Sequence, residues 1–288
     1  MPLINLPGEI LLGIASFLSS ENDIDSLAKT STRLHHLLNS VLYRHNVTHS
    51  NSSALLWAAT KGQDTTARLC IQQGADPNTA GEMNATPLSL AVNHGHSNVV
   101  AVLLECKDTD VNTGTDRGFA PLYCAALFGV RDVVKLLLED TRVDMDVRGS
   151  RWREAPLHAA AIGGNTEVVK LLLDDPRVDV NVRDLRQFTP LALAAESGYA
   201  DTVRLLLDDE RVDVNLTDSE NRTPLCLAAG KGIAEIVRLL LQRPDVDVHC
   251  ACGHENSTPL HEAVHSGQVD QVKLLFEHGG VDVSLENS

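Results

Sequence analysis

From residue 53 onward the chain repeats one pattern of apolar and polar positions. In each copy, a short apolar segment ends at a glycine, and a second apolar segment follows after a few polar residues. The second segments place their apolar residues at a spacing that gives one buried stripe on a helix. They read VVAVLLE, VVKLLLE, VVKLLLD, TVRLLLD, IVRLLLQ and QVKLLFE. Each copy therefore predicts two helices joined as a helical hairpin.

The residues at the two ends of the first apolar segment support the prediction that this segment is a helix. Six segments contain a Pro-Leu pair, and successive pairs lie 34 or 35 residues apart; the prolines are Pro87, Pro121, Pro156, Pro190, Pro224 and Pro259. A proline is well tolerated at the first position of a helix, where its missing N–H costs nothing, and a preceding threonine can cap that helix. The glycine at the end favours a helix stop. A V-D-V-N-like extended stretch follows each second segment.

The recurring string T-P-L-x-x-A-A-x-x-G, with the V-D-V-N stretch, resembles the ankyrin repeat. Seven copies begin near residues 53, 86, 120, 155, 189, 223 and 258. The resemblance implies an all-α fold, a solenoid of stacked helical hairpins with short hairpin loops, since no single hairpin can bury its apolar face alone. Most copies depart from the usual length by one or two residues, as in DDPRVDVN where the family more often has GADVN, which lengthens one loop.

Residues 1–50 follow a different pattern, so we predict two domains, 1–50 and 51–288. The string LPGEILLGIASFL, followed by DIDSLAKT, resembles the F-box, a helical module that docks on the Skp-family adaptor of cullin-RING ubiquitin ligases. Leu34 stands where many F-boxes have a tryptophan. The resemblance implies adaptor contacts through Leu6, Pro7, Ile10, Leu11, Ile14, Leu18 and Leu27. The alternative is an amphipathic helical cap that only shields the first copy.

Charge and composition narrow the range of partners. The formal net charge of −15 opposes contact with nucleic acid and with anionic membranes, and no apolar run is long enough to span a bilayer. Six cysteines lie mostly inside apolar segments, which indicates reduced core residues, and no basic residue precedes Lys29 as a signal peptide would require. We expect a cytoplasmic or nuclear protein that is monomeric apart from its partners.

The resemblance to ankyrin repeats also implies where a protein target binds. The family places variable residues on the hairpin tips and just before the glycine that ends the first helix. Four of the ten aromatic residues, Phe119, Phe128, Trp152 and Phe188, fall on these outward positions. Aromatic and arginine side chains dominate binding hot spots. The predicted target-binding residues are Arg117, Phe119, Leu127, Phe128, Arg151, Trp152, Ile162, Leu185, Arg186 and Phe188. The alternative is that rings such as Phe119 and Phe188 pack across adjacent tips and rigidify the array.

Sequence motifs give no reason to expect catalysis. The segment HCACGH at 249–254 has cysteines too close for a usual zinc site, so we predict no metal and no cofactor. The recurring pairs Glu139/Asp140, Asp174/Asp175 and Asp208/Asp209 are interpreted as solvated turn residues. His158 and His261 follow Pro-Leu, where the family uses histidine for hydrogen bonds between neighbouring repeats. No segment completes a phosphate-binding loop.

The predicted function is a non-enzymatic adaptor. Residues 1–50 would attach it to a ubiquitin ligase, and the repeats would bind a protein target whose identity the sequence does not reveal. The alternative is a plain ankyrin scaffold whose N-terminal helices only cap the stack.

Overall fold

The computed structural model describes residues 53–149, 151–253 and 257–278. Over these ranges the secondary structure is helical, apart from two isolated bridges, Gly149 with Glu154 and Cys252 with Ser257. The predicted all-α class is confirmed. None of the described helices is long and apolar enough to cross a membrane. The predicted adaptor-binding residues, Leu6 to Leu27, and the predicted domain boundary at 50/51 lie outside the described ranges.

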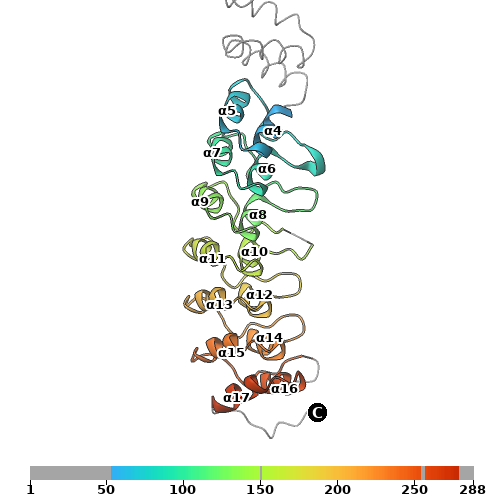
Figure 1. Cartoon of the computed structure of the whole chain (residues 1–288), viewed down its shortest axis with the longest axis vertical. Coiled ribbons are helices and arrows are strands. Elements are labelled where there is room, and N and C mark those ends of the chain that lie inside the picture. Colours follow the sequence, from blue (N-terminus) through green and yellow to red (C-terminus); the bar gives the residue numbers. More distant parts are fainter. Residues whose placement is uncertain (1–52, 150, 254–256, 279–288) are drawn as a thin grey trace, which may run out of the picture. The chain divides into compact units, whose positions relative to one another are not determined.

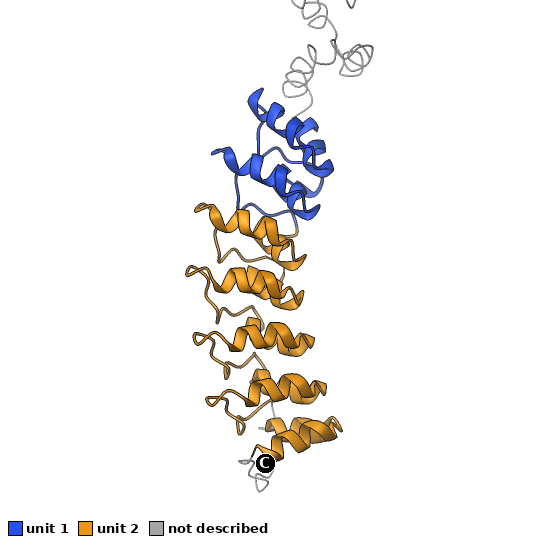
Figure 2. Ribbon diagram, turned by 60° about the vertical axis from the view of Figure 1, so that its left-hand side comes forward, with its two compact units in different colours: residues 1–116 blue, residues 117–288 orange. Residues whose placement is uncertain are grey.

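Two compact units make up the chain, one ending at Asp116 and the other beginning at Arg117 (Figure 2). The described part of the first unit holds two hairpins, in which α4 packs against α6 and α5 against α7. Its elements are α4 (Ser53–Lys61), α5 (Asp64–Gln72), the 3-10 turn η2 (Glu82–Asn84), α6 (Pro87–Asn93) and α7 (Ser97–Glu105). These are the first two copies of the sequence pattern.

Copies three to seven form the second unit, and each folds as one hairpin. The first helices α8, α10, α12, α14 and α16 stack in one row, and the second helices stack in a parallel row (Figure 1). The ten helices are α8 (Pro121–Leu127), α9 (Arg131–Glu139), α10 (Pro156–Ile162), α11 (Thr166–Leu173), α12 (Pro190–Ser197), α13 (Ala200–Leu207), α14 (Pro224–Lys231), α15 (Ala234–Leu241), α16 (Pro259–His265) and α17 (Val269–Glu277). The stacking buries the leucine of the Pro-Leu pair in copies three to six: Leu122, Leu157, Leu191 and Leu225 are at most 1% exposed.

The helix ends follow the sequence signals. The side chains of Thr86, Thr189 and Thr223 each accept a hydrogen bond from the backbone N–H three residues later, at 3.1–3.3 Å. Every first helix of the second unit has proline at its first position. Gly129, which follows α8, has a φ of +69°, and a Cβ there would lie 2.4 Å from Asn165 Oδ1. Glycine is therefore required by both backbone conformation and space.

A repeated arginine contact joins neighbouring second helices. The guanidinium of Arg177 pairs with Asp175 at 2.6 Å and donates to the carbonyl of Leu138 in the preceding copy at 2.8 Å. Arg211 makes the same contacts with Asp209 at 2.6 Å and with Leu173 at 2.7 Å. These bonds satisfy last-turn carbonyls that have no partner within their own helix. The lengthened loops DDPRVDVN and DDERVDVN supply Arg177 and Arg211.

This contact corrects the interpretation of the carboxylate pairs. The second acid of each pair was expected to be solvated, yet the side chains of Asp140, Asp175 and Asp209 are only 14%, 12% and 16% exposed. In each case the hydrogen bond from the arginine two residues later lowers the pKa of the carboxyl group. Asp175 and Asp209 thus hold Arg177 and Arg211 in place for the carbonyls that these arginines bind.

We predict that Arg211→Ala lowers the free energy of unfolding by about 1 kcal/mol, because it removes the ion pair with Asp209 and the hydrogen bond to the Leu173 carbonyl at a half-exposed site. Arg211→Lys should restore little of this loss, since lysine cannot reach the carboxylate and the carbonyl with one planar group. Urea denaturation of the three proteins measures the difference. Full recovery in the lysine variant would mean that charge alone matters there.

Candidate target-binding surface

The loop that precedes each Pro-Leu pair, here called the tip loop, is organised by a buried aspartate in copies five and six. Asp184 is 3% exposed, and its Oδ1 accepts the backbone N–H groups of Arg186 and Phe188, both at 2.8 Å. Asp218 is 4% exposed and accepts those of Glu220 and Arg222, both at 2.9 Å. Each carboxylate thus closes its loop into one conformation.

Adjacent tip loops are also bonded to one another. The backbone N–H of Leu185 donates to the carbonyl of Trp152 at 2.8 Å, and that of Ser219 donates to the carbonyl of Arg186 at 2.8 Å. The tip loops of copies four, five and six therefore form one connected edge.

Arginine and aromatic side chains contact one another along this edge. The guanidiniums of Arg151 and Arg186 lie 4.8 Å and 4.7 Å from the centroid of the Trp152 ring. Those of Arg186 and Arg222 lie 4.8 Å and 6.0 Å from the centroid of Phe188. These are cation–π distances. We call Arg151, Trp152, Arg186, Phe188 and Arg222 the tip stack.

Carboxylates neutralise the inner arginines of the tip stack. Arg186 pairs with Asp184 at 3.1 Å and with Glu154 at 3.5 Å, and Arg222 pairs with Asp218 at 2.7 Å. Arg117 and Arg151 are exposed and form no ion pair with a described carboxylate. The positive charge available to a partner on the tip loops therefore belongs to Arg117 and Arg151.

The structure places the ten predicted target-binding residues at different depths. Four are exposed, five are half-buried and one is buried. The exposed side chains are Arg117, Phe128, Arg151 and Leu185; the half-buried ones are Phe119, Leu127, Trp152, Ile162 and Arg186; the buried one is Phe188.

The prediction that Phe188 faces outward is wrong. Its side chain is 4% exposed and packs with Ala192, Leu193 and Leu227. Ile162 of the preceding copy packs against the same cluster. Phe188 stands two residues before Pro190, and the residues at the same place in copies two and four, Ala85 and Glu154, are buried as well. The Phe188 N–H also donates to Asp184, which, like Asp218, stands five residues before its Thr-Pro pair, a signal that the sequence analysis missed.

Phe119 is also less available than expected. Its ring stacks on Tyr123 with centroids 5.4 Å apart, and the Tyr123 hydroxyl donates to Glu154 at 2.8 Å. The alternative for Phe119 was a structural role in which its ring packs across adjacent tips. The ring does pack on another ring, but its partner Tyr123 lies in the same copy. Trp152 and the 60% exposed Phe128 remain as the accessible aromatic side chains of the predicted set.

His158 has the structural role that the family resemblance implied. It is fully buried, its Nδ1 accepts the N–H of Ala155 at 3.1 Å, and its Nε2–H donates to the carbonyl of Phe188 in the next copy at 2.9 Å. These partners require the neutral Nε2–H tautomer. Burial lowers the pKa of the imidazole. The predicted hydrogen bond between neighbouring copies is confirmed for His158.

We expect the lowered pKa of His158 to make the fold sensitive to mild acid. Protons bind the unfolded chain below its ordinary histidine pKa of about 6.5, whereas the folded chain resists protonation. The contribution of His158 is therefore complete above that pH and is lost as the pH falls toward the lower folded value. His158→Gln should flatten the decrease in unfolding free energy as the pH falls below about 6.5. Urea denaturation at several pH values measures it; parallel curves for both proteins would contradict this account.

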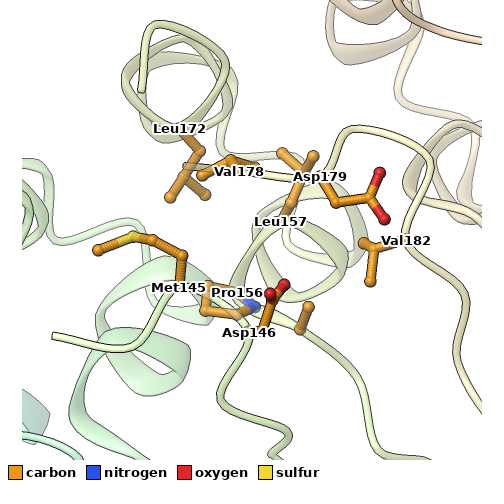
Figure 3. A pocket seen from close by; sticks show the side chains of 9 residues that line it. Met145, Asp146, Pro156, Leu157, Leu172, Val178, Asp179 and Val182 are labelled. Carbon is orange, nitrogen blue, oxygen red and sulfur yellow. The ribbon is translucent and has the colours of Figure 1, made fainter. Parts of the chain in front are cut away.

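A small apolar pocket lies between copies three and four. It is lined mainly by Met145, Leu157, Leu172, Val178 and Val182 (Figure 3). It has no room for a water-sized sphere. Because small-molecule sites usually enclose several hundred Å³, this pocket is a packing crevice.

Comparison with known families agrees with this architecture. The sequence model described as ankyrin repeats (3 copies) matches residues 24–115, 55–149, 122–218 and 191–287. The chain belongs to the ankyrin repeat family. A search of curated proteins found no match. No F-box match was found, and the first ankyrin match begins at residue 24, within the region that resembles an F-box.

Membership of the ankyrin repeat family indicates a protein–protein interaction domain. Ankyrin repeat proteins are typically scaffolds without enzymatic activity. The connected tip loops and the exposed Phe128 are therefore the places to look for the partner's contacts.

Proposed function

We propose that this ankyrin protein recognises a protein target through the tip loops of copies three to six and presents it to a ubiquitin ligase. Target recognition by the tip loops is supported above all by Trp152. Its partly exposed ring lies against the guanidiniums of Arg151 and Arg186, and its backbone carbonyl is bonded to the next tip loop. A pre-organised aromatic anchor loses little entropy on binding.

The charge distribution indicates the chemistry of the target. Arg117 and Arg151 are exposed, whereas Arg186 is already paired with carboxylates. An extended segment that carries an apolar residue for the Trp152 ring and acidic residues for the outer arginines would suit this edge. The acidity of the whole chain would repel most other anionic proteins, which favours selectivity.

The ligase half of the proposal rests on the string LPGEILLGIASFL in residues 6–18. Through its resemblance to the F-box we propose that Leu6, Pro7 and Ile10, with the other four predicted contacts, bind a Skp-family adaptor. We place this activity in the cytoplasm or the nucleus. The second candidate is a plain scaffold, and the ankyrin match that begins at residue 24 favours it.

Calorimetry with the full-length chain and a purified Skp-family adaptor tests the ligase half. We expect binding that is lost in the double variant Ile10→Asp and Ile14→Asp. The matched control is Val264→Asp with Val269→Asp, which changes two exposed apolar side chains of the last copy in the same way. Absence of binding by the folded wild-type chain would leave the plain scaffold.

A further inference from the structure

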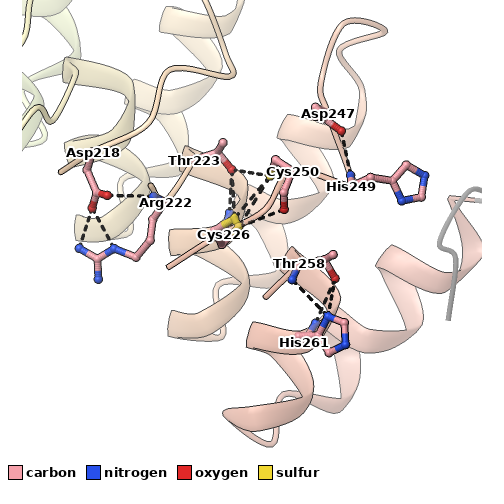
Figure 4. Close-up of a disulfide and its surroundings, with 10 residues drawn as sticks. Asp218, Arg222, Thr223, Cys226, Asp247, His249, Cys250, Thr258 and His261 are labelled. Atoms are coloured by element: carbon pink, nitrogen blue, oxygen red, sulfur yellow. Dashed lines mark hydrogen bonds and ion pairs between the residues drawn. A yellow bond between two sulfur atoms is a disulfide. The ribbon is translucent and has the colours of Figure 1, made fainter. Parts of the chain in front are cut away.

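Three cysteines from two neighbouring copies meet in the second unit. Cys226 lies in α14, and Cys250 lies in the segment that leads to the last tip loop (Figure 4). Cys252 follows two residues later in that segment. Their sulfur atoms all lie within 4.8 Å of one another. The structure joins Cys226 and Cys252 in a disulfide, which corrects the expectation that all six cysteines are reduced. Cys250 Sγ lies 3.6 Å and 3.7 Å from the other two sulfurs.

The cysteines occupy positions that join neighbouring copies elsewhere in the unit. Cys226 is the third residue after its capping threonine, the place taken by His158 in copy four. The Cys252 N–H binds the carbonyl of Ser257, as the Asp184 N–H binds that of Phe188. The contact between copies six and seven therefore has cysteine side chains at the positions that His158 and Asp184 occupy in earlier copies.

Two-electron reduction of the Cys226–Cys252 bond by a dithiol or a phosphine, which is oxidised in exchange, would leave three thiols between copies six and seven. Around a tetrahedral zinc ion with Zn–S bonds of about 2.3 Å, neighbouring sulfurs lie about 3.8 Å apart. The two non-bonded separations of Cys250 are close to that value. The third, between Cys226 and Cys252, must widen once the bond is broken. Soft thiolates select zinc(II) and copper(I) over harder ions.

We propose that Cys226, Cys250 and Cys252, when reduced, bind a thiophilic metal ion, zinc(II) or copper(I), that links copies six and seven. Copper(I) is satisfied by three thiolates, whereas zinc(II) would take a water as its fourth ligand. The three thiols release their protons to solvent as the ion binds. Thr223 Oγ1 lies 3.2 Å from Cys226 Sγ and 3.3 Å from Cys250 Sγ, within reach to orient both sulfurs.

Proton release and nearby charge both bear on metal affinity. Thiols bind a metal ion as thiolates, so the ion must displace their protons, which makes its affinity increase with pH. The nearby Asp247 carboxylate also adds negative charge that favours a cation.

Sequence reasoning could not find this set. The segment HCACGH offered ligands from one stretch only, whereas zinc sites usually bring ligands from two elements. Cys226 lies 24 residues before Cys250, and only the stacking of copy seven on copy six brings it to the same place.

The test uses the full-length chain, reduced with a phosphine and freed of metal. Zinc(II) and, in a separate anaerobic arm, copper(I) are titrated in competition with a chromophoric chelator. We expect one ion per chain, and a loss of affinity of at least about tenfold for Cys226→Ser and for Cys250→Ser. Cys70→Ala and Cys124→Ala should bind as wild type, since burial raises the pKa of these two distant thiols to about 11.

Cadmium(II) adds an independent readout, because its thiolate complexes absorb in the ultraviolet and the band reports sulfur ligation.

Saturation by either zinc(II) or copper(I) supports the proposal and identifies the ion. Cys250 is half-exposed in a loop, so its serine variant should fold even if that of Cys226 does not. The proposal is overturned if the folded, reduced chain retains neither ion, or if Cys250→Ser binds as wild type. Binding by the oxidised chain, which keeps only one of the three thiols, would also overturn it.

Discussion

Phe188→Ala is expected to lower the free energy of unfolding by about 3–5 kcal/mol, the usual cost of removing a buried phenylalanine ring. The ring is 4% exposed and fills space between Ala192 and Leu193 of its own copy and Leu227 of the next. Alanine would leave a cavity at a joint between copies. It would also remove the surface on which the guanidiniums of Arg186 and Arg222 lie. The substitution should therefore loosen the tip stack as well as the core.

Urea denaturation followed by circular dichroism measures this effect, with Phe128→Ala as the matched control. The Phe128 ring is 60% exposed, so its removal should change the unfolding free energy by less than about 0.5 kcal/mol. Equal effects of the two substitutions would contradict the burial of Phe188. The comparison also separates a core ring from a surface ring that the sequence pattern had grouped together.

Trp152→Ala is expected to weaken target binding by about 2–4 kcal/mol, which corresponds to a roughly 30-fold to 1,000-fold increase in Kd. The ring is half-buried between copies and held by two guanidiniums at 4.7 Å and 4.8 Å, so it meets a partner already ordered. Loss of these cation–π contacts should cost about 1 kcal/mol of stability or less at this half-exposed site. Binding should therefore fall much more than folding.

A displayed library of extended segments with apolar and acidic residues supplies the ligand for this measurement. The full-length chain selects a segment, and calorimetry compares its Kd for wild type, Trp152→Ala and Phe276→Ala. Phe276 is 62% exposed on α17, so it is an accessible aromatic side chain away from the tip stack. A selected segment that binds all three proteins equally would place the recognition surface elsewhere. A segment lost only with Trp152→Ala would assign the anchor.

The helices themselves could be predicted from local sequence. Thr189 caps α12 through its own side chain, Pro190 occupies the first helical position, and Gly198 ends the helix with a φ of +87°. Each of these effects acts over three or four residues, so a repeated string is enough to reveal it. The role of His158 was implied by the family resemblance, and its partner is the Phe188 carbonyl of the next copy.

The depth of the site residues could not be predicted in the same way. Trp152 and Phe188 both lie in tip loops, yet one is half-exposed and the other is buried. They stand at different positions of the loop: Trp152 lies four residues before Pro156, whereas Phe188 lies two residues before Pro190. The second position is also buried as Ala85 and Glu154, so a rule that assigns all tip positions to the surface fails there.

The sequence by itself determined the repeat, the helix boundaries and the leucine core, because these depend on capping, proline, glycine and periodic burial along a short stretch of chain. Only the tertiary structure decided which aromatic rings are accessible, where Arg177 and Arg211 reach, and that Cys226 meets Cys250 and Cys252. Those contacts join residues 24 to 39 positions apart, and they form only when one copy stacks on the next.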